Sequence, residues 1–267
     1  MFIIDFIEAF IARNGPLAYW LALFVIAGFL VIFGKALYLL LRRRKIQIRG
    51  FTWKAFRYEI VFSIINLVVT AFLLGGLTSQ LTGHGFISFR QGPVEWWVIA
   101  LEYALYFVAF DTYFYWFHRL MHKEPIYTWV HKIHHHSTSP NPLTTLSVSP
   151  FESLINGGFV PLFTAALTLH ESTMLLIGPT NIIMGLYVHS GFEFMPRWWN
   201  KTWFTRWFIT ATFHDQHHHY FRGNYGGYTI LWDWICGTIR PHYWSDFDKI
   251  KARGADTDRV AIEPEPG

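Results

Sequence analysis

The sequence has few of the groups that build disulfide frameworks or cysteine-based metal sites. A single cysteine, Cys236, is present among 267 residues, so no disulfide and no zinc or iron–sulfur site made of several cysteines can form within the chain. Charged residues are also scarce, at 15%, against about 25% in soluble globular domains. The net charge of +4 is modest and the basic residues form no stripe with interleaved aromatics, so nucleic-acid binding is not indicated.

Signatures of several enzyme classes are missing as well. The sequence has no recognisable haem, flavin or nicotinamide motif, so electrons for any redox reaction must come from another protein. It has no HExxH pattern, because His170 and Glu171 are followed by Ser172, Thr173 and Met174. A zinc-dependent intramembrane hydrolase is therefore a less favoured alternative, since it needs a general base positioned beside its metal.

Apolar and aromatic residues are abundant instead, at 52% and 19%. This composition indicates a membrane protein, in which Trp and Tyr suit the membrane–water interfaces. Residues 17–41, 60–81 and 94–117 are each long enough to cross the hydrocarbon core. Residues 151–188 are apolar but interrupted by glycine and proline, and we expect two shorter helices there with a turn near His170. The predicted fold is all-α, an integral membrane protein with about four to five membrane segments and a cytoplasmic histidine-rich helical cap.

The distribution of charge predicts the orientation and the regions of the chain. Four basic residues, 42–45, directly follow the first apolar segment, which places this loop in the cytoplasm by the positive-inside rule. The third span then returns the chain to the cytoplasmic face at His118. We expect membrane helices over residues 1–110, a catalytic region over 111–244 and a charged, flexible tail over 245–267.

Histidines are concentrated in three clusters after these spans. His118 and His122 are four residues apart, which places both on one face of a helix. Two HxxHH boxes follow, and because their last two histidines are offset by about 100°, one helix can offer imidazoles to two adjacent metals. Eight imidazoles are too many for one tetrahedral zinc, so two metals are favoured, although zinc, copper, nickel and iron all accept nitrogen. The box residues are His131, His134, His135, His214, His217 and His218.

Asp111 lies two helical turns before His118, so both can occupy one face of the third span. A carboxylate at membrane depth is costly and usually has a partner. Two interpretations remain open for Asp111: it accepts a hydrogen bond that orients a ligand histidine, or it pairs with an arginine or tyrosine.

The motifs DTYFYWFHRLMH, HKIHHHS, HSGFE, HDQHHHYFRGNYG and WDWICGT, between Asp111 and Thr238, resemble those of the fatty acid hydroxylase superfamily. These membrane non-haem di-iron enzymes include sterol desaturases and sterol C-4 methyl oxidases. The resemblance implies two iron ions held by His118, His122, His131, His134, His135, His189, His214, His217 and His218. Asn224, in the NYG after the last box, is either a turn residue or a water-mediated metal contact. We expect His136 and His219 to be second-shell or surface residues, and His84, His170 and His242 to bind no metal.

The resemblance also implies the chemistry. We expect an O2-dependent hydroxylase or desaturase acting on an unactivated C–H position of a lipid, with a sterol or related isoprenoid favoured by HSGFE and WDWICGT. A fatty acyl or alkyl-ether lipid is the alternative. A cytochrome b5-like or ferredoxin-like protein with a reductase would supply electrons, and basic residues could attract it or merely reflect positive-inside topology: Lys123, Lys132, Arg197, Lys201, Arg206 and Arg222. A metal transporter is less favoured, because the histidines cluster after the spans.

Overall fold

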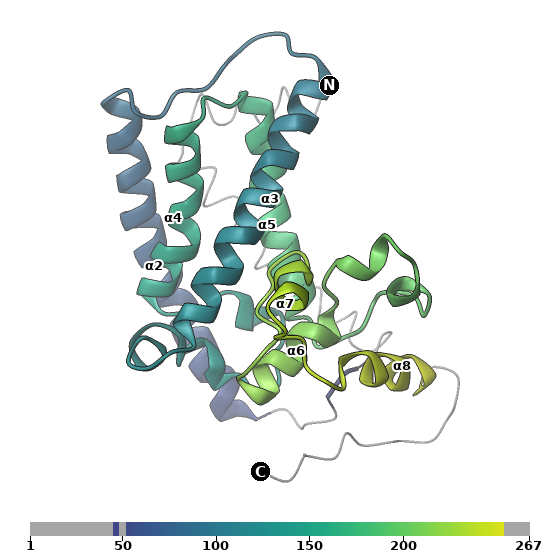
Figure 1. Cartoon of the computed structure of the whole chain (residues 1–267). Coiled ribbons are helices and arrows are strands. Elements are labelled where there is room, and N and C mark those ends of the chain that lie inside the picture. The colour runs from purple at the N-terminus through teal and green to yellow at the C-terminus, as the bar shows by residue number, and fades with distance from the viewer. Residues whose placement is uncertain (1–44, 48–51, 254–267) are drawn as a thin grey trace.

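The computed structural model describes residues 45–47 and 52–253, and in this part of the chain the protein is all-α, as predicted (Figure 1). Four long helices form an elongated bundle: α2 (Trp53–Gly83), α3 (Trp96–Met121), α4 (Pro150–Ala166) and α5 (Glu171–Val188). Three shorter helices lie at one end of it: α6 (Ala211–Tyr220), α7 (Leu231–Ile235) and α8 (Tyr243–Arg253). Within these ranges the only β-structure consists of isolated bridges, such as that between Phe208 and Thr229.

Two of these helices are long and apolar enough to cross a membrane. α2 has 31 residues and α3 has 26, which exceeds the roughly 20 needed for the hydrocarbon core. They correspond to the predicted segments 60–81 and 94–117. The predicted segment 17–41 and the N-terminal residues 1–13 lie outside the described residues, so the expected four to five membrane segments stay a prediction.

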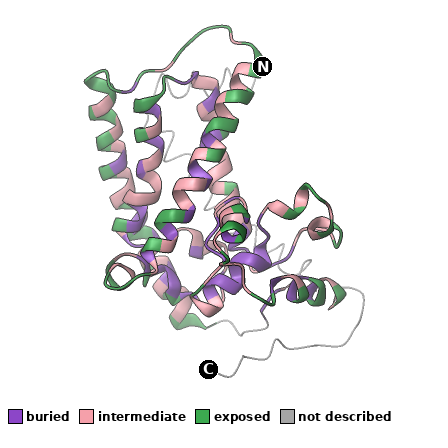
Figure 2. Ribbon diagram, in the orientation of Figure 1, coloured by how far each residue is buried: buried purple, intermediate pink, exposed green. Residues whose placement is uncertain are grey.

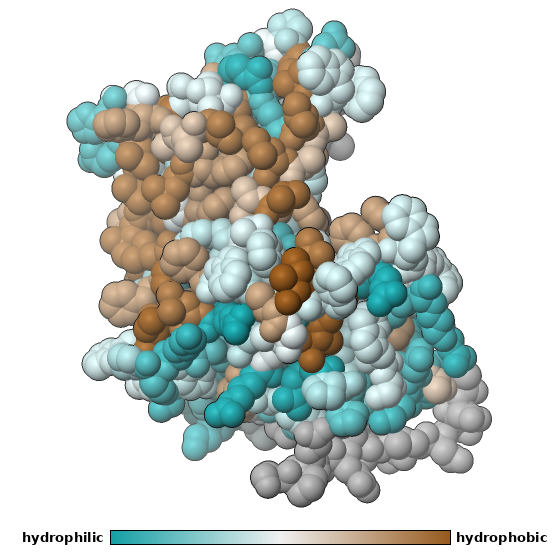
Figure 3. All heavy atoms as spheres, viewed as in Figure 1, coloured by the Kyte–Doolittle hydropathy of each residue, from teal (hydrophilic) through white to brown (hydrophobic). Residues whose placement is uncertain are grey.

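The arrangement of side chains on α2 is the reverse of that on a helix in a soluble protein. Its buried residues include Glu59, Ser63 and Asn66, whereas large apolar residues such as Val61 and Phe72 are exposed. The buried Glu59 accepts hydrogen bonds from Ser137, Asn141 and Thr144 in the loop after the second histidine cluster. A helix with a polar inner face and an apolar outer face suits contact with lipid, and Figure 3 shows the hydrophobic surface of this bundle.

The apolar segment 151–188 forms two helices, α4 and α5, with a turn at Leu167–His170, as predicted. Pro161 and Pro179 were expected to interrupt the segment, but each lies inside a helix. His170 is the N-cap of α5: its Nδ1 accepts from the backbone N–H of Ser172. Its other ring nitrogen is hydrogen-bonded to the Gly92 carbonyl.

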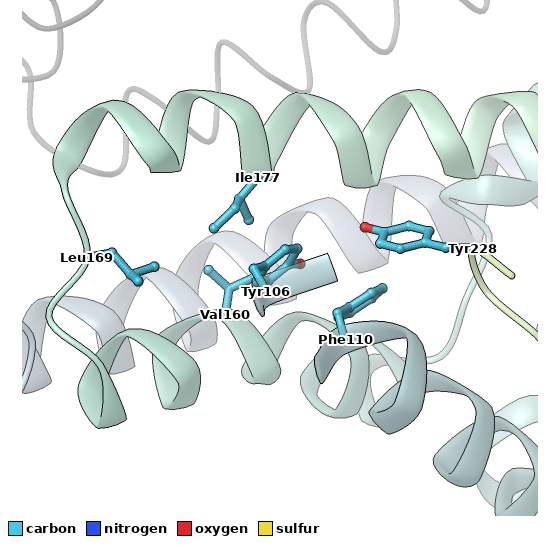
Figure 4. Packing of buried hydrophobic residues seen from close by; sticks show 6 residues of the cluster. All are labelled: Tyr106, Phe110, Val160, Leu169, Ile177 and Tyr228. Carbon is cyan, nitrogen blue, oxygen red and sulfur yellow. The ribbon is translucent and has the colours of Figure 1, made fainter. Parts of the chain in front are cut away.

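An aromatic core joins α3, α4 and α5. Tyr106 and Phe110 of α3 meet Val160 of α4 and Ile177 of α5, and Tyr228 closes this cluster from the loop before α7 (Figure 4). The ring centroids of Phe110 and Tyr228 are 5.2 Å apart. This packing holds α3 and α5, which carry His118 and His189 at their ends, against each other.

The C-terminal region is ordered further than predicted. A flexible tail was expected from residue 245, but residues up to Arg253 belong to α8, which packs on α6. The reason is amphipathicity, since Phe247 and Ile250 of α8 are buried while Asp248 and Lys249 are exposed. Residues 254–267 lie outside the described part of the chain.

Candidate metal centre

The first two histidine clusters lie on the end of α3 and the short turns that follow it. His118 is in the last turn of α3 and His122 is its C-cap. The second cluster was expected on a regular helix, but it spans a π-helical turn, η2 (Tyr127–His131), and a 3-10 turn, η3 (His134–His136). This irregular backbone still directs the three box histidines inward, since His131, His134 and His135 are all buried.

The third cluster lies on α6, a helix that is polar in sequence and yet buried from Ala211 to His218 (Figure 2). Its N-cap, Thr210, accepts a hydrogen bond from the backbone N–H of Phe213. His189, from the HSGFE segment, is the C-cap of α5, which contacts α6. Three of the four histidines on α6, those at 214, 217 and 218, are buried. Their imidazoles require specific partners, because burying polar groups without a partner is costly.

The nine histidines named from the sequence come together as two adjacent groups. Site A comprises His118, His122, His131, His135 and His217, and site B comprises His134, His189, His214 and His218. Within each site the potential ligand nitrogens all lie within 4.8 Å of one another.

Each HxxHH box divides its histidines between the two sites. In the second cluster the first and last box residues, His131 and His135, belong to site A and His134 belongs to site B. In α6 the assignment is reversed, because His214 and His218 belong to site B and His217 to site A. The i, i+4 pair thus shares a site and the i+3 residue faces the other, as expected for neighbours on one helical face.

The Nε2 atoms converge at the centre of each site. In site A, Nε2 of His217 is 3.1 Å from Nε2 of His122 and 3.0 Å from that of His135. In site B, Nε2 of His189 is 3.2 Å from Nε2 of His134 and 2.9 Å from that of His214. Such short distances between several ring nitrogens indicate positions arranged around common points.

The opposite ring nitrogens are held by backbone carbonyls. Nδ1 of His118 donates to Tyr225 O at 2.8 Å, that of His189 to Gly185 O at 2.8 Å, and that of His217 to Gly223 O at 2.8 Å. Because a carbonyl can only accept, the proton of each neutral ring must be on Nδ1. These imidazoles therefore present the Nε2 lone pair, the form that binds a metal.

Burial keeps these histidines neutral. It lowers the pKa of His122 to about 2 and that of His189 to about 4. Burial, reinforced by neighbouring imidazoles, lowers the pKa of His131, His135 and His217 well below its usual range. Neutral imidazoles are required of metal ligands.

One atom tests directly whether this donor set fits a metal. Nδ1 of His218 donates to Ser137 O at 3.0 Å, so its Nε2 carries a lone pair, and that Nε2 is buried without any hydrogen-bond partner. A desolvated acceptor of this kind is unfavourable unless a cation or donor satisfies it. The residues of both sites therefore fit a pair of metal ions bound by imidazole nitrogen.

A carboxylate that the sequence analysis did not single out completes site A. Oε2 of Glu152, in the first turn of α4, lies 2.9 Å from Nδ1 of His131, and both side chains are buried. A carboxylate behind a ligand histidine fixes the ring and raises its basicity. The available signal was an acidic residue at the start of an otherwise apolar segment, directly after the loop that follows the second cluster.

Two further acidic residues explain why the HSGFE and WDWICGT motifs accompany the histidines. Glu193 accepts from the backbone N–H and the hydroxyl of Thr212, which holds the first turn of α6. Asp233 accepts from the backbone N–H groups of Tyr225 and Gly226. It thereby fixes the loop whose Tyr225 carbonyl orients His118.

The structure defines the hydrogen bonds of Asp111. Oδ1 of Asp111 accepts from the backbone N–H groups of Tyr228 and Thr229, and Oδ2 accepts from the Thr229 hydroxyl. Among the described residues, its hydrogen-bond partners are therefore groups of the loop before α7, where the sequence analysis considered a ligand histidine, an arginine or a tyrosine side chain. Asp111 thus holds the loop before α7, and the Tyr225 carbonyl of the same loop contacts His118.

Asn224 is a turn residue. Its backbone has a φ of 56°, a left-handed conformation that asparagine tolerates. Its Nδ2 donates to Phe213 O, and its Oδ1 accepts from the backbone N–H of Arg240. Both ends of the amide thus have protein partners, which argues against the suggested water-mediated metal contact.

The other histidines lie outside both sites. His136 stacks on Tyr58 with ring centroids 3.9 Å apart, and His219 packs edge-on against Tyr220. His84 is the C-cap of α2, and His242 precedes α8. Together with the capping residue His170, these five histidines are not among the residues of sites A and B. That His84, His170 and His242 bind no metal stays a prediction.

Comparison with known proteins identifies relatives that share about a third of the aligned residues with this chain. Methylsterol monooxygenase erg25A of Aspergillus fumigatus is 34% identical over 53% of this chain and 47% of its own length. Methylsterol monooxygenase erg25B of the same fungus is 35% identical over 53% of this chain and 49% of its own. The very-long-chain aldehyde decarbonylase GL1-11 of Oryza sativa subsp. indica is 34% identical, over 55% and 56%.

These matches cover only about half the length of each relative. No solved structure matches the chain. The model of the fatty acid hydroxylase family matches residues 103–238, a range that contains all nine histidines of sites A and B. This match covers about half of the chain, and on that basis the chain belongs to the fatty acid hydroxylase family.

Proposed function

We propose that this protein is a membrane-bound di-iron oxidoreductase that uses O2 to hydroxylate or desaturate an unactivated C–H position of a lipid. The observation that carries the proposal is the convergence of nine imidazoles, eight of them buried and that of His122 half-buried, into sites A and B with lone pairs directed inward. Five and four nitrogen ligands suit two adjacent metals that each retain room for a further ligand, and imidazole donors accept iron.

Each part of the chain has a defined task in this proposal. When bound, two irons would supply the activation of O2 and the oxidation of the C–H bond. The carbonyls of Tyr225, Gly185 and Gly223 orient the ligand rings, and Glu152 fixes His131. The buried surroundings exclude water from the reaction, and preorganised ligands avoid reorganisation when metal binds.

A lipid substrate is supported by the apolar outer surface of α2 and α3 and by the names of the relatives. Two are called methylsterol monooxygenases, which favours a sterol or related isoprenoid. Another is called a very-long-chain aldehyde decarbonylase, so a fatty acyl or alkyl-ether lipid is the second candidate. Both candidates use the same ligand set and differ in which carbon reaches the metals.

The proposal includes a topology and an electron source. We place sites A and B at the cytoplasmic end of α3, because the basic residues 42–45 precede α2 and the ligands follow α3. Two electrons per turnover would come from a cytochrome b5-like or ferredoxin-like protein with its reductase, since the chain has no motif for an organic redox cofactor.

Lipid analysis of a host with and without this gene, grown with and without oxygen, tests the proposed function. We expect one lipid to accumulate without the gene and its hydroxylated or desaturated product to appear only with the gene and oxygen. His217→Ala should abolish the product and His136→Ala should retain it, because only His217 belongs to site A. An oxygen-independent hydrolytic product, with zinc in the purified protein, would instead support the zinc hydrolase.

A further inference from the structure

Among the large apolar side chains that are exposed outside the two candidate spans, six lie on two segments in the C-terminal part of the described chain. Trp198, Trp203 and Phe204 belong to the loop 194–208, and Leu231, Trp234 and Ile235 belong to α7. Their exposed fractions range from 41% for Leu231 to 83% for Trp203. We call this set of six residues the collar. An exposed apolar cluster of this kind marks an interaction surface.

The two halves of the collar form one rigid surface. The rings of Trp207 and Trp234 pack edge to face with centroids 5.5 Å apart. The backbone N–H of Ile230 donates to Trp207 O at 2.8 Å, and that of Ile209 donates to Tyr228 O at 3.1 Å. The loop and α7 are therefore fixed to each other by backbone as well as ring contacts.

The collar continues the apolar surface of α3. Phe208 contacts Phe107 of α3 at 6.4 Å between centroids, and Trp232 contacts Trp116 at 5.6 Å. Nε1 of Trp232 also donates to the Thr112 hydroxyl. Thr112 and Trp116 precede the end of α3 by about 14 and 8 Å at ~1.5 Å per residue. α7 thus lies beside the last turns of the candidate span and not beyond them, and Figure 3 shows hydrophobic surface in this area.

Basic side chains lie on the same loop. Arg197, Lys201 and Arg206 are all exposed. The guanidinium of Arg206 lies over the Trp207 ring, 5.4 Å from its centroid. Tryptophans that alternate with exposed cations suit the headgroup region, where the rings reach the acyl chains and the cations meet phosphate.

From these contacts we infer that the collar inserts into the headgroup–acyl boundary of the leaflet at the end of α3. Its partner is the surface of a phospholipid bilayer containing anionic headgroups. The spanning helices anchor the protein, and the collar sets the depth of sites A and B, since the loop before α7 is also held by Asp111 and supplies the carbonyl that orients His118. This inference rests on α3 crossing the membrane, as the proposed function assumes.

Spin labels on the full-length chain test the inference. Trp203→Cys and Trp234→Cys, each in a Cys236→Ser background, are labelled and reconstituted with bound metal in nanodiscs of phosphatidylcholine and phosphatidylglycerol. Collision with O2, which partitions into lipid, is compared with collision with a water-soluble nickel chelate. Phe72→Cys, at an exposed position of α2, serves as the lipid control. Ala252→Cys, at an exposed position in the last turn of α8, serves as the aqueous control.

At positions 203 and 234 we expect an O2-to-nickel collision ratio at least several-fold above that at 252 and approaching that at 72. A ratio equal to that at 252 would overturn the inference. Protection from both reagents would do so too, since it would indicate a second chain or another protein covering the collar. If position 72 is also reached by nickel, the membrane assignment itself fails, whereas loss of lipid oxidation with these ratios intact would count against the proposed function alone.

Discussion

Glu152 and His131 form a buried contact between α4 and the second histidine cluster, with Oε2 of the carboxylate 2.9 Å from Nδ1 of the imidazole. Among the described residues, Glu152 is the one carboxylate that lies within ion-pair distance of a histidine of site A or site B. The other rings whose Nδ1 contacts are defined face neutral carbonyls, as His118 and His217 do. Site A therefore differs from site B in having an acidic side chain behind one of its histidines, as well as in ligand number.

We predict that Glu152→Ala weakens metal binding at site A by about 10- to 100-fold, the usual effect of removing a partner behind a ligand histidine. Glu152→Gln should lose less, because its amide oxygen can occupy the position of Oε2 close to Nδ1. Competition with a graded chelator, followed by metal analysis, measures the effect. Glu124→Gln is the matched control, since Glu124 is exposed and contacts Thr128. Equal affinity in Glu152→Ala and the unmodified protein would contradict the role of the carboxylate.

Three consecutive histidines on α6 give a direct test of the division into two sites. His217 belongs to site A and His218 to site B, while His219 belongs to neither. We expect His217→Ala and His218→Ala each to reduce bound metal from about two to about one per chain, because each removes one ligand from a different site. His219→Ala should retain both metals. Metal analysis of protein purified in detergent provides the counts, and full retention in His217→Ala would refute the assignment.

The metal-free protein should lose stability on acidification. Burial lowers the pKa of His122 to about 2 and of His189 to about 4, and it lowers the pKa of His134, His135 and His218 well below its usual range. In the unfolded chain these groups bind protons near pH 6.5. Below that pH the unfolded state therefore holds more protons, and the free energy of unfolding falls by up to about 1.4 kcal/mol per group and pH unit.

Melting temperatures of chelator-treated protein between pH 8 and pH 5.5 test this dependence. We expect little change from pH 8 to pH 7 and a steep decrease below pH 6.5. Bound metal should move the decrease to lower pH, because metal and protons compete for the same nitrogens. A melting temperature that stays constant to pH 5.5 in the metal-free protein would contradict the burial of neutral imidazoles.

Asp111 should act on stability and only indirectly on metal binding. Asp111→Ala leaves two backbone donors, those of Tyr228 and Thr229, without their acceptor. We expect a loss of roughly 3 kcal/mol, from the cost of buried unsatisfied groups, and a smaller loss for Asp111→Asn. Thermal unfolding in detergent measures the loss. Val108→Ala serves as a control at an exposed position of the same helix, and a loss as large there as in Asp111→Ala would refute this role.

Much of the site could be predicted from sequence because its spacing is local. The HxxxH and HxxHH patterns place imidazoles on common faces, and all nine named histidines come together in the structure. The turn near His170 was also predicted, since the segment 151–188 must leave and return to the same side if all three histidine clusters build one site. The all-α character followed from the apolar composition, although the π-helical and 3-10 turns at the second cluster did not, because they depend on tertiary contacts.

Contacts between residues far apart in sequence were not predictable from local patterns. Glu152 reaches His131 across the loop 137–149, and nothing in the spacing relates them. Asp111 has the correct helical phase to face His118, yet the loop before α7 provides backbone donors that it binds instead. The amphipathic α8 was hidden by its charged surface residues, because its burial depends on α6.

We propose that sites A and B hold a pair of iron ions. X-ray absorption and Mössbauer spectroscopy on the purified, detergent-solubilised protein, loaded with 57Fe, measure this pair. We expect about two irons per chain in a nitrogen-rich environment and an interaction between the two irons. His217→Ala and His218→Ala should each abolish this interaction, and His219→Ala should preserve it. A single tightly bound zinc, or two irons whose spectra are unchanged in His217→Ala and His218→Ala, would contradict it.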